Sequence, residues 1–86
     1  DDAARSVTRA GQPVDLTRTE YDLLSTLLRH AGQVLSKRQL LVQVWGFDAF
    51  DPNVVEAHMI ALRRKLEAHG PRVIHTVRGV GYLVKG

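Results

Sequence analysis

Two short segments carry the same signal for the start of a helix, and they constrain the fold more than any other feature. The segments are LTRTEY at residues 16–21 and LSKRQL at residues 35–40. In each, a hydroxyl residue follows a leucine, and a Glu or Gln stands three positions later. Such a pair closes a capping box, because the hydroxyl accepts the N3 backbone N–H and the N3 side chain accepts the N–H of the cap. The sequence therefore predicts helix starts directly after Thr17 and Ser36.

Apolar spacing and glycines set the extent of these two helices. The first is predicted over residues 18–30, with Gly32 as its stop and with a buried face made of Leu24, Leu27, Leu28 and Ala31. The second is predicted over residues 37–45, with Gly46 at its end and with an inward face made of Leu40, Leu41 and Val44.

A third helix is predicted over residues 53–68, between Pro52 and the Gly70–Pro71 pair. Its inner stripe consists of Val55, Met59, Leu62 and Leu66. The opposite face consists of Asn53, Ala57, Ile60 and Arg64. We interpret the inner stripe as core, which leaves the outer face available for binding.

The two ends of the chain read as strand pairs. Residues 6–8 and 12–15 predict one short hairpin, and residues 73–77 and 80–84 predict a second. With 86 residues and 44% hydrophobic content, the chain can close one modest core, so residues 1–86 are predicted to form one domain. The order of elements predicts an α+β winged helix-turn-helix, with N-terminal antiparallel strands, three helices and a C-terminal β-hairpin wing.

Composition excludes several classes of function. The chain has no cysteine, which removes disulfides, thiolate catalysis and thiolate metal sites. No apolar run approaches the roughly 20 residues of a membrane helix and no secretory signal opens the chain, so a cytoplasmic protein is expected. The four histidines form no His-x₃-His pair, and GVG at residues 79–81 matches neither the dinucleotide fingerprint nor a P-loop. We therefore expect no metal, no cofactor and no enzymatic activity.

Charge is distributed unevenly along the chain. Residues 1–62 hold six Lys and Arg against eight Asp and Glu, whereas residues 63–86 hold six against Glu67 alone. A segment of charge +5 thus follows a body of charge −2. This polarity is typical of proteins that bind a phosphate backbone, although a solvated basic face would give the same count.

The outer face of the third predicted helix is small and nearly uncharged at Ala57, Ile60 and Ala61, and it becomes cationic at residues 63–65. A small face can approach base edges in the major groove, where apolar side chains touch thymine methyl groups. The cations would lie toward phosphates. The alternative is a solvated helix whose late cations complement the macrodipole.

The segment HTVRGVGYLV, residues 75–84, combines strand-like alternation with two glycines and a cation. Gly79 supplies the positive φ of a tight turn, and Gly81 lets backbone or nucleic acid come close. Arg78 is thereby presented at the end of a narrow projection, which suits the minor groove. The alternative is an arbitrary exposed arginine beside a turn.

Two further side chains have open roles. Trp45 is the only tryptophan and is interpreted mainly as core, but its indole N–H needs an acceptor, and a phosphate would serve. His58 lies at the margin of the buried stripe, where it either reaches a phosphate or simply packs.

Three segments carry a family resemblance: LTRTEYDLLSTLLRHAGQVLSKRQLLVQVWG, NVVEAHMIALRRKLEA and HTVRGVGYLV. Their combined motifs resemble the C-terminal DNA-binding domain of OmpR/PhoB-type response regulators of bacterial two-component systems, from about Arg9 onward. The resemblance implies a winged helix with its third helix in the major groove and its hairpin wing at the minor groove. It implies a sequence-specific binder of double-stranded DNA that regulates transcription, binds direct repeats as a tandem dimer and, when bound, associates with the bacterial nucleoid.

Residue roles follow from the same resemblance. It implies phosphate contacts at Trp45, His58 and Arg63, base-facing positions at Asn53, Val54, Ala57, Ala61 and Arg64, and wing positions at Thr76, Arg78 and Tyr82. The resemblance also implies that the loop over residues 46–53 is a surface that can contact RNA polymerase. The residues of this surface are Phe47, Asp48, Phe50 and Asp51. The two phenylalanines are equally compatible with the core of the domain itself.

The chain departs from the family pattern in two ways. Relatives often carry arginines where this chain has Ile60 and Ala61, so its sequence preference cannot be copied from them. The chain also begins with DDAARSV, a start that by the resemblance lies after the family's first strand, and this predicts a truncated N-terminal sheet. The phosphate-accepting receiver domain of such regulators does not fit in 86 residues, so it is expected elsewhere in a longer protein.

Two other classes of function stay open at this point. A winged-helix protein-interaction module would use Ile60, Phe47 and Phe50 as its adhesive surface. A small basic hydrolase would use His58 or His75 with a lysine or arginine, but no paired carboxylate or nucleophile supports it.

Overall fold

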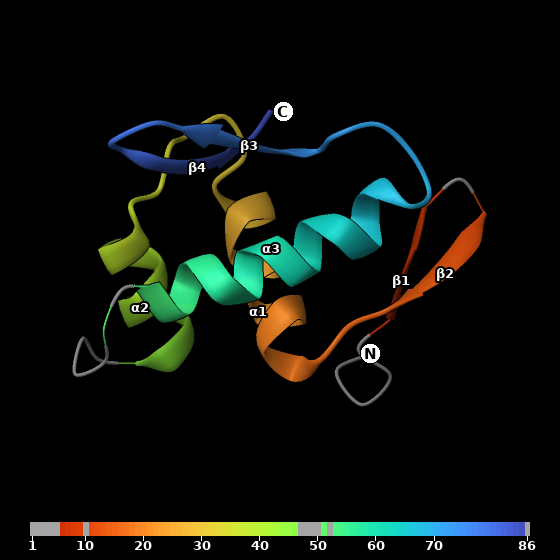
Figure 1. Cartoon of the computed structure of the whole chain (residues 1–86), viewed down its shortest axis with the longest axis horizontal. Coiled ribbons are helices and arrows are strands. Elements are labelled where there is room, and N and C mark those ends of the chain that lie inside the picture. The colour runs from red at the N-terminus through yellow and green to blue at the C-terminus, as the bar shows by residue number, and fades with distance from the viewer. Residues whose placement is uncertain (1–5, 10, 47–50, 52, 86) are drawn as a thin grey trace.

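The computed structural model describes residues 6–9, 11–46, 51 and 53–85. Its elements are, in order, β1 (Ser6–Arg9), β2 (Gln12–Asp15), α1 (Arg18–Arg29), α2 (Lys37–Trp45), α3 (Asn53–Glu67), β3 (Ile74–Val77) and β4 (Gly81–Val84). In Figure 1, α3 crosses in front of α1, the β1–β2 hairpin lies at one end of the molecule, and the β3–β4 hairpin lies above α2 and α3. The predicted α+β order of strands, three helices and hairpin is therefore present.

Each hairpin is a separate two-stranded antiparallel sheet in the part of the chain that the structure describes. Val7 pairs with Val14 in the first, and Thr76 pairs with Tyr82 in the second. An isolated antiparallel β-bridge joins Leu35 to Tyr82, so the connection between α1 and α2 pairs with β4 of the C-terminal hairpin. This bridge holds β4 against the helices.

Both predicted capping boxes are confirmed. Thr17 Oγ1 accepts from the Glu20 N–H at 3.2 Å, and Glu20 Oε1 accepts from the Thr17 N–H at 3.0 Å. Ser36 and Gln39 repeat the arrangement at 3.0 and 2.8 Å. Gly46 ends α2 in the left-handed region, with φ of 89°, as the sequence predicts. The helix starts agree with the prediction because capping is settled within four residues.

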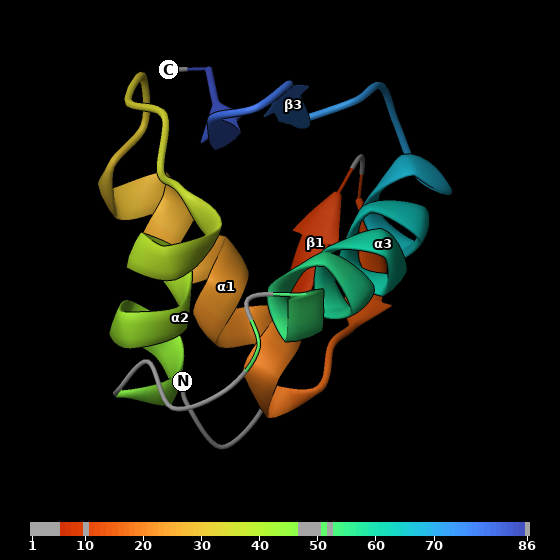
Figure 2. The same cartoon turned by 60° about the vertical axis from the view of Figure 1, so that its left-hand side comes forward.

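One core lies between the three helices and the two hairpins. Figure 2, turned from the first view, shows α2, α1 and α3 side by side beneath the β3–β4 hairpin. The predicted inner stripe of α3 is buried throughout, and Leu40 and Leu41 of α2 are completely buried. The other core residues include Val14, Leu23, Leu27, Leu35, Ile74, Tyr82 and Val84.

The predicted buried face of α1 is partly wrong. Leu24 and Leu27 are buried, but Leu28 is 51% exposed and Ala31 is exposed. Leu23 and Thr26 are buried instead. Leu28 lies at the edge of the stripe, where it lines a surface hollow with Val7. The buried face is therefore rotated toward Leu23, and apolar spacing alone does not fix where such a stripe ends.

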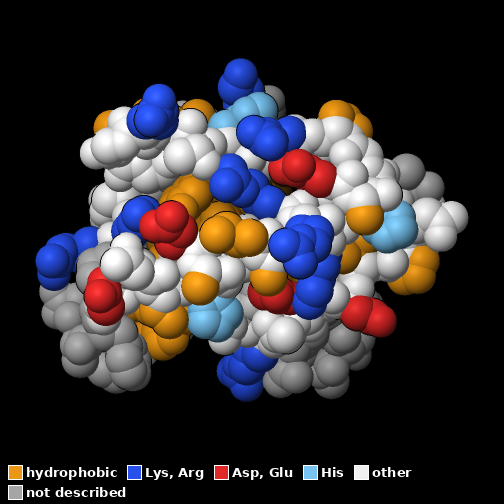
Figure 3. Space-filling view, viewed as in Figure 1, with side chains coloured by type: hydrophobic (Ala, Val, Ile, Leu, Met, Phe, Trp, Pro, Cys, Tyr) orange, Lys and Arg blue, Asp and Glu red, His pale blue; other side chains and the backbone are white. Residues whose placement is uncertain are grey.

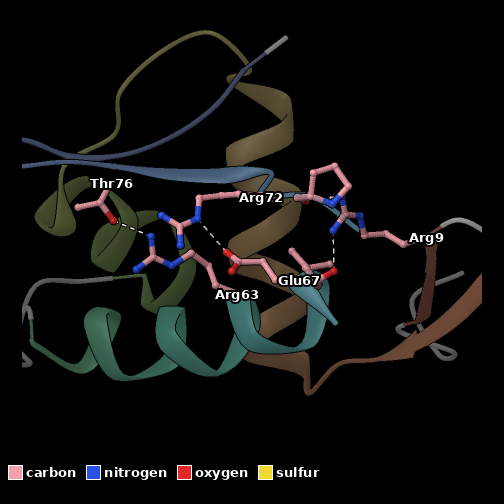
Figure 4. Close-up of polar contacts among 7 residues, drawn as sticks. Arg9, Arg63, Glu67, Arg72 and Thr76 are labelled. Atoms are coloured by element: carbon pink, nitrogen blue, oxygen red, sulfur yellow. Dashed lines mark hydrogen bonds and ion pairs between the residues drawn. The ribbon is translucent and has the colours of Figure 1, made fainter. Parts of the chain in front are cut away.

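Arg9 of β1 ties the N-terminal hairpin to the end of α3 (Figure 4). Its guanidinium donates to the backbone oxygens of Leu66 and Pro71, both at 2.5 Å. A Cβ on Gly70 would lie 2.8 Å from the same guanidinium, so the glycine leaves room for this contact. Arg9 thus links β1 to the last turn of α3 and to the segment that follows it.

Candidate nucleic-acid interface

The two faces of α3 separate as predicted. Its exposed residues are Asn53, Glu56, Ala57, Ile60, Arg64 and Glu67, and Ile60 is 50% exposed. Val54 and Ala61 are half-buried at the margin of the exposed face. Small side chains on this face let the helix backbone approach a partner closely, while the inner stripe fixes the helix against the core.

One flank of α3 is joined to the C-terminal hairpin by Arg63. Its Nη1 donates to Thr76 Oγ1 of β3 at 2.6 Å (Figure 4), and its guanidinium carbon lies 5.7 Å from the centre of the Tyr82 ring. Tyr82 is only 4% exposed, so its ring packs beneath the Arg63 guanidinium and does not face solvent. The structure therefore gathers three of the predicted site residues into one cluster.

A second cluster of predicted site residues lies where α2 ends against α3. The rings of Trp45 and His58 meet edge to face with centroids 5.4 Å apart. His58 Nδ1 lies 2.8 Å from the Val54 carbonyl oxygen, one turn earlier in α3. Both side chains are half-buried. Trp45 packs against the core, which agrees with its interpretation as mainly a core residue. The backbone contact orients the imidazole, so its other nitrogen is the one available to a partner.

The tip of the C-terminal hairpin is the turn at residues 78–80. Gly79 has φ of 76°, which confirms its predicted role in a tight turn. Arg78 is exposed beside it, and Val80 is 55% exposed. The arginine is therefore presented on a narrow projection, as predicted.

Gly81 has a more specific role than the sequence indicated. A Cβ at this position would lie 2.0 Å from the Leu35 backbone oxygen. Reciprocal backbone hydrogen bonds between Leu35 and Tyr82, of 2.8 and 2.9 Å, hold the two segments at this spacing. The close approach that the glycine permits is thus to the protein's own backbone, and it seats the hairpin on the α1–α2 connection.

The loop between α2 and α3 is described at Gly46 and Asp51. Asp51 is exposed, and its Oδ1 accepts from the Asn53 N–H at 2.9 Å at the start of α3. Phe47, Asp48 and Phe50, which belong to the predicted polymerase surface, lie outside the described residues.

A cleft of about 400 Å³ separates the turn of the hairpin from the start of α2. Its lining includes Lys37, Arg38, Glu56, Thr76 and Gly79. Lys37 Nζ and Glu56 Oε2 are 2.8 Å apart within it. Sequence reasoning did not identify either residue, because the pair spans two helices and has no local spacing signal.

Lys and Arg side chains are spread over the face of the molecule on which α3 lies (Figure 3). Figure 3, which views the molecule from the α3 side, shows Lys and Arg side chains distributed across this face with apolar side chains between them. Within the described residues no group of three His, Asp or Glu side chains is placed to hold a metal ion, and no helix there is long and apolar enough to cross a membrane.

The family model described as transcriptional regulatory protein, C terminal, matches residues 11–84. The chain belongs to this family. It is 48% identical over 87 residues to the response regulator MprA of Mycolicibacterium vanbaalenii, covering 99% of this chain and 38% of that protein. It is 56% identical over 77 residues to the transcriptional regulatory protein PrrA of Mycobacterium leprae, covering 87% of this chain and 33% of that protein. The chain thus spans between 33% and 38% of the length of these curated relatives.

Solved structures give the same result. The DNA-binding domain of Klebsiella pneumoniae RstA, solved in complex with the RstA box, has a TM-score of 0.81 and 36% identity, over 99% of this chain and 87% of that one. The predicted OmpR/PhoB-type family and the predicted winged-helix fold are therefore confirmed. The two relatives of this chain are named as a response regulator and a transcriptional regulatory protein, not as enzymes.

Proposed function

We propose that this domain binds double-stranded DNA and regulates transcription as the output domain of a bacterial two-component response regulator. The observation that carries the proposal is the arrangement of α3 and the β3–β4 turn. A helix with small exposed side chains lies beside a narrow hairpin turn that presents Arg78. The contact between Arg63 and Thr76 joins the helix to the hairpin. The RstA domain, which shares the fold, supports it because that domain was solved with its DNA box.

In the proposed complex, α3 lies in the major groove. Asn53, Val54, Ala57, Ala61 and Arg64 face base edges. The alanines and the exposed Ile60 suit contact with thymine methyl groups, while Arg64 and Asn53 supply hydrogen-bond donors. Because the helix offers few charges on this face, we expect much of its discrimination to come from apolar contacts.

The phosphate contacts lie on the two flanks of α3. On one flank, Trp45 and His58 present an indole N–H and the free imidazole nitrogen. On the other flank, Arg63 keeps further N–H groups beyond the one given to Thr76, and Tyr82 holds its guanidinium in place. An arginine ordered in advance loses less conformational entropy when it binds a phosphate.

Arg78 enters the minor groove from the turn of the hairpin, where a narrow A/T tract strengthens the negative potential. The remaining partners are also proposals: a receiver domain in the full-length protein, a second copy bound in tandem on a direct repeat, and RNA polymerase at the loop that includes Asp51. The tandem arrangement implies that an isolated domain binds weakly.

Arg78→Ala is expected to weaken DNA binding by about 1–3 kcal/mol, because the variant loses the cation in the minor groove. The duplex is first selected from a random pool with the wild-type domain, and affinity is then measured by fluorescence anisotropy at several salt concentrations. If five or six cations contact phosphates, log K falls against log salt with a slope of about −5 for wild type.

Arg18→Ala is the matched control, since Arg18 is an exposed arginine in the first turn of α1, outside the proposed interface. It should bind as wild type does. Wild-type affinity for Arg78→Ala and Arg64→Ala together would refute the residue assignment. Binding by the wild-type domain that shows no dependence on salt, together with loss of a protein partner in Ile60→Glu, would favour a protein-interaction module instead.

A further inference from the structure

An ion pair joins the first residue of α2 to the first turn of α3 inside the cleft below the hairpin turn. Lys37 Nζ and Glu56 Oε2 are 2.8 Å apart, and the side chains are 37% and 49% exposed. Neither residue is among the DNA contacts proposed above. The hydrogen bond to Glu56 raises the pKa of Lys37 above its ordinary value.

Glu56 lies on the same flank of α3 as Arg63, because residues seven apart are separated by about two helical turns. Arg63 contacts Thr76 and Tyr82, so this flank faces the β3–β4 hairpin. The cleft is therefore bounded by the start of α2, by this flank of α3 and by the turn at residues 78–80.

A sugar-phosphate strand must cross this cleft if the proposed complex forms. Neighbouring major and minor grooves are separated by one backbone strand. With α3 in one groove and Arg78 in the next, that strand passes between the helix and the turn. Its phosphates then come close to both members of the ion pair, one of which attracts them and one of which repels them.

We propose that Lys37 is a phosphate contact and that Glu56 competes with the phosphate for it. This inference rests on the DNA-binding role proposed above. While the cleft is empty, the carboxylate neutralises the lysine. When a backbone strand enters, Lys37 turns its donors to the phosphate and Glu56 is left near an anion. Glu56 thus lowers the affinity for every duplex, and the loss is greatest where the backbone passes closest, so the pair makes binding sensitive to groove shape.

The test measures the affinity of Glu56→Gln and Lys37→Gln for the selected duplex across a range of salt. Glu56→Gln should bind about three- to tenfold more tightly than wild type near 0.1 M salt, and the gain should shrink as salt screens the charges. Lys37→Gln should bind more weakly and reduce the salt slope by about one. Exposed ion pairs contribute little to stability, so both variants should unfold near the wild-type temperature.

Glu67→Gln is the matched control for the change in net charge. Glu67 is also a paired glutamate of α3, 3.1 Å from Arg72, but it lies eleven positions further along the helix. That separation is about 16 Å along the axis, beyond the Debye length of about 10 Å at 0.1 M salt. Its substitution should change affinity much less than Glu56→Gln does.

The outcomes separate this inference from the proposed function. If wild type shows no salt-dependent binding, the DNA-binding role itself fails. If wild type binds but Glu56→Gln binds no more tightly than Glu67→Gln, Glu56 is no competitor and the inference is wrong. If Lys37→Gln binds as wild type does, the pair only links α2 to α3, and the inference is equally wrong.

Discussion

Gly81→Ala is expected to destabilise the domain by about 3 kcal/mol or more. The added Cβ would lie 2.0 Å from the Leu35 backbone oxygen. Because the position of a Cβ is set by its own backbone, no side-chain rotation can relieve this contact. To accommodate it, β4 must move away from the α1–α2 connection and lose its reciprocal hydrogen bonds with Leu35. Overpacking alone typically costs about 1–3 kcal/mol, and buried hydrogen bonds are lost in addition.

Urea denaturation followed by circular dichroism measures this effect. Gly79→Ala is the control from the same hairpin, because nothing lies within 4 Å of its added Cβ and only the positive φ of 76° opposes it. That strain should cost about 1–2 kcal/mol. Equal losses for the two variants would show that β4 is not held against Leu35 by the close approach.

Lys65→Met is expected to destabilise the domain by about 1–3 kcal/mol. Lys65 Nζ lies 2.5 Å from Glu20 Oε1, and the Glu20 side chain is only 5% exposed. Removing the lysine leaves a buried carboxylate whose remaining hydrogen-bond partners are the backbone N–H and the side chain of Thr17. Fully buried pairs lose about 3–5 kcal/mol when one partner is removed, but Lys65 is 37% exposed, so water relieves part of the loss.

This effect should depend on pH. Burial acts to raise the pKa of Glu20, but its hydrogen bonds to Lys65 and to Thr17 outweigh burial and lower the pKa below its usual value of 4.5. A lowered carboxyl pKa stabilises the fold above the unfolded pKa, and that stability is lost as pH falls through the folded pKa. In Lys65→Met, burial opposes ionisation without the lysine. The difference between wild type and variant should therefore be largest above about pH 4.5 and shrink in acid.

Lys37→Met provides the comparison within the same molecule. Lys37 and Lys65 have equal side-chain exposure of 37%, but the partner Glu56 is 49% exposed where Glu20 is 5% exposed. The exposed pair should contribute about 0–1 kcal/mol. Free energies of unfolding measured at pH 7 and at pH 4 check both values. A loss in Lys37→Met as large as that in Lys65→Met would show that burial of the glutamate is not the cause.

Local signals in the sequence predicted most of the fold. The two capping boxes, the inner stripe of α3 and the glycine of the hairpin turn are all settled within a few residues. The prediction for α1 was partly wrong at Leu28, because an amphipathic stripe has two possible edges and only the packing of the neighbouring elements decides between them. The hairpins also differ from the prediction by one residue at some ends, where strand pairing depends on the partner strand.

The candidate site was predicted as a set of residues but not as an arrangement. The sequence pointed to Arg63, Thr76 and Tyr82 separately, and the structure joins them into one cluster with Tyr82 buried beneath the arginine. The Lys37–Glu56 pair was not predicted, since its members meet only when α2 packs against α3.

The sequence by itself determined where the helices begin, which face of α3 is buried and where the hairpin turns, because these features depend on contacts between residues a few positions apart. Only the tertiary structure decided which surfaces meet. Gly81 illustrates the difference: its partner Leu35 is far away along the chain, and a glycine carries no side chain from which that partner could be inferred. Contacts of this kind depend on how whole elements pack, so their energies appear only after the chain has folded.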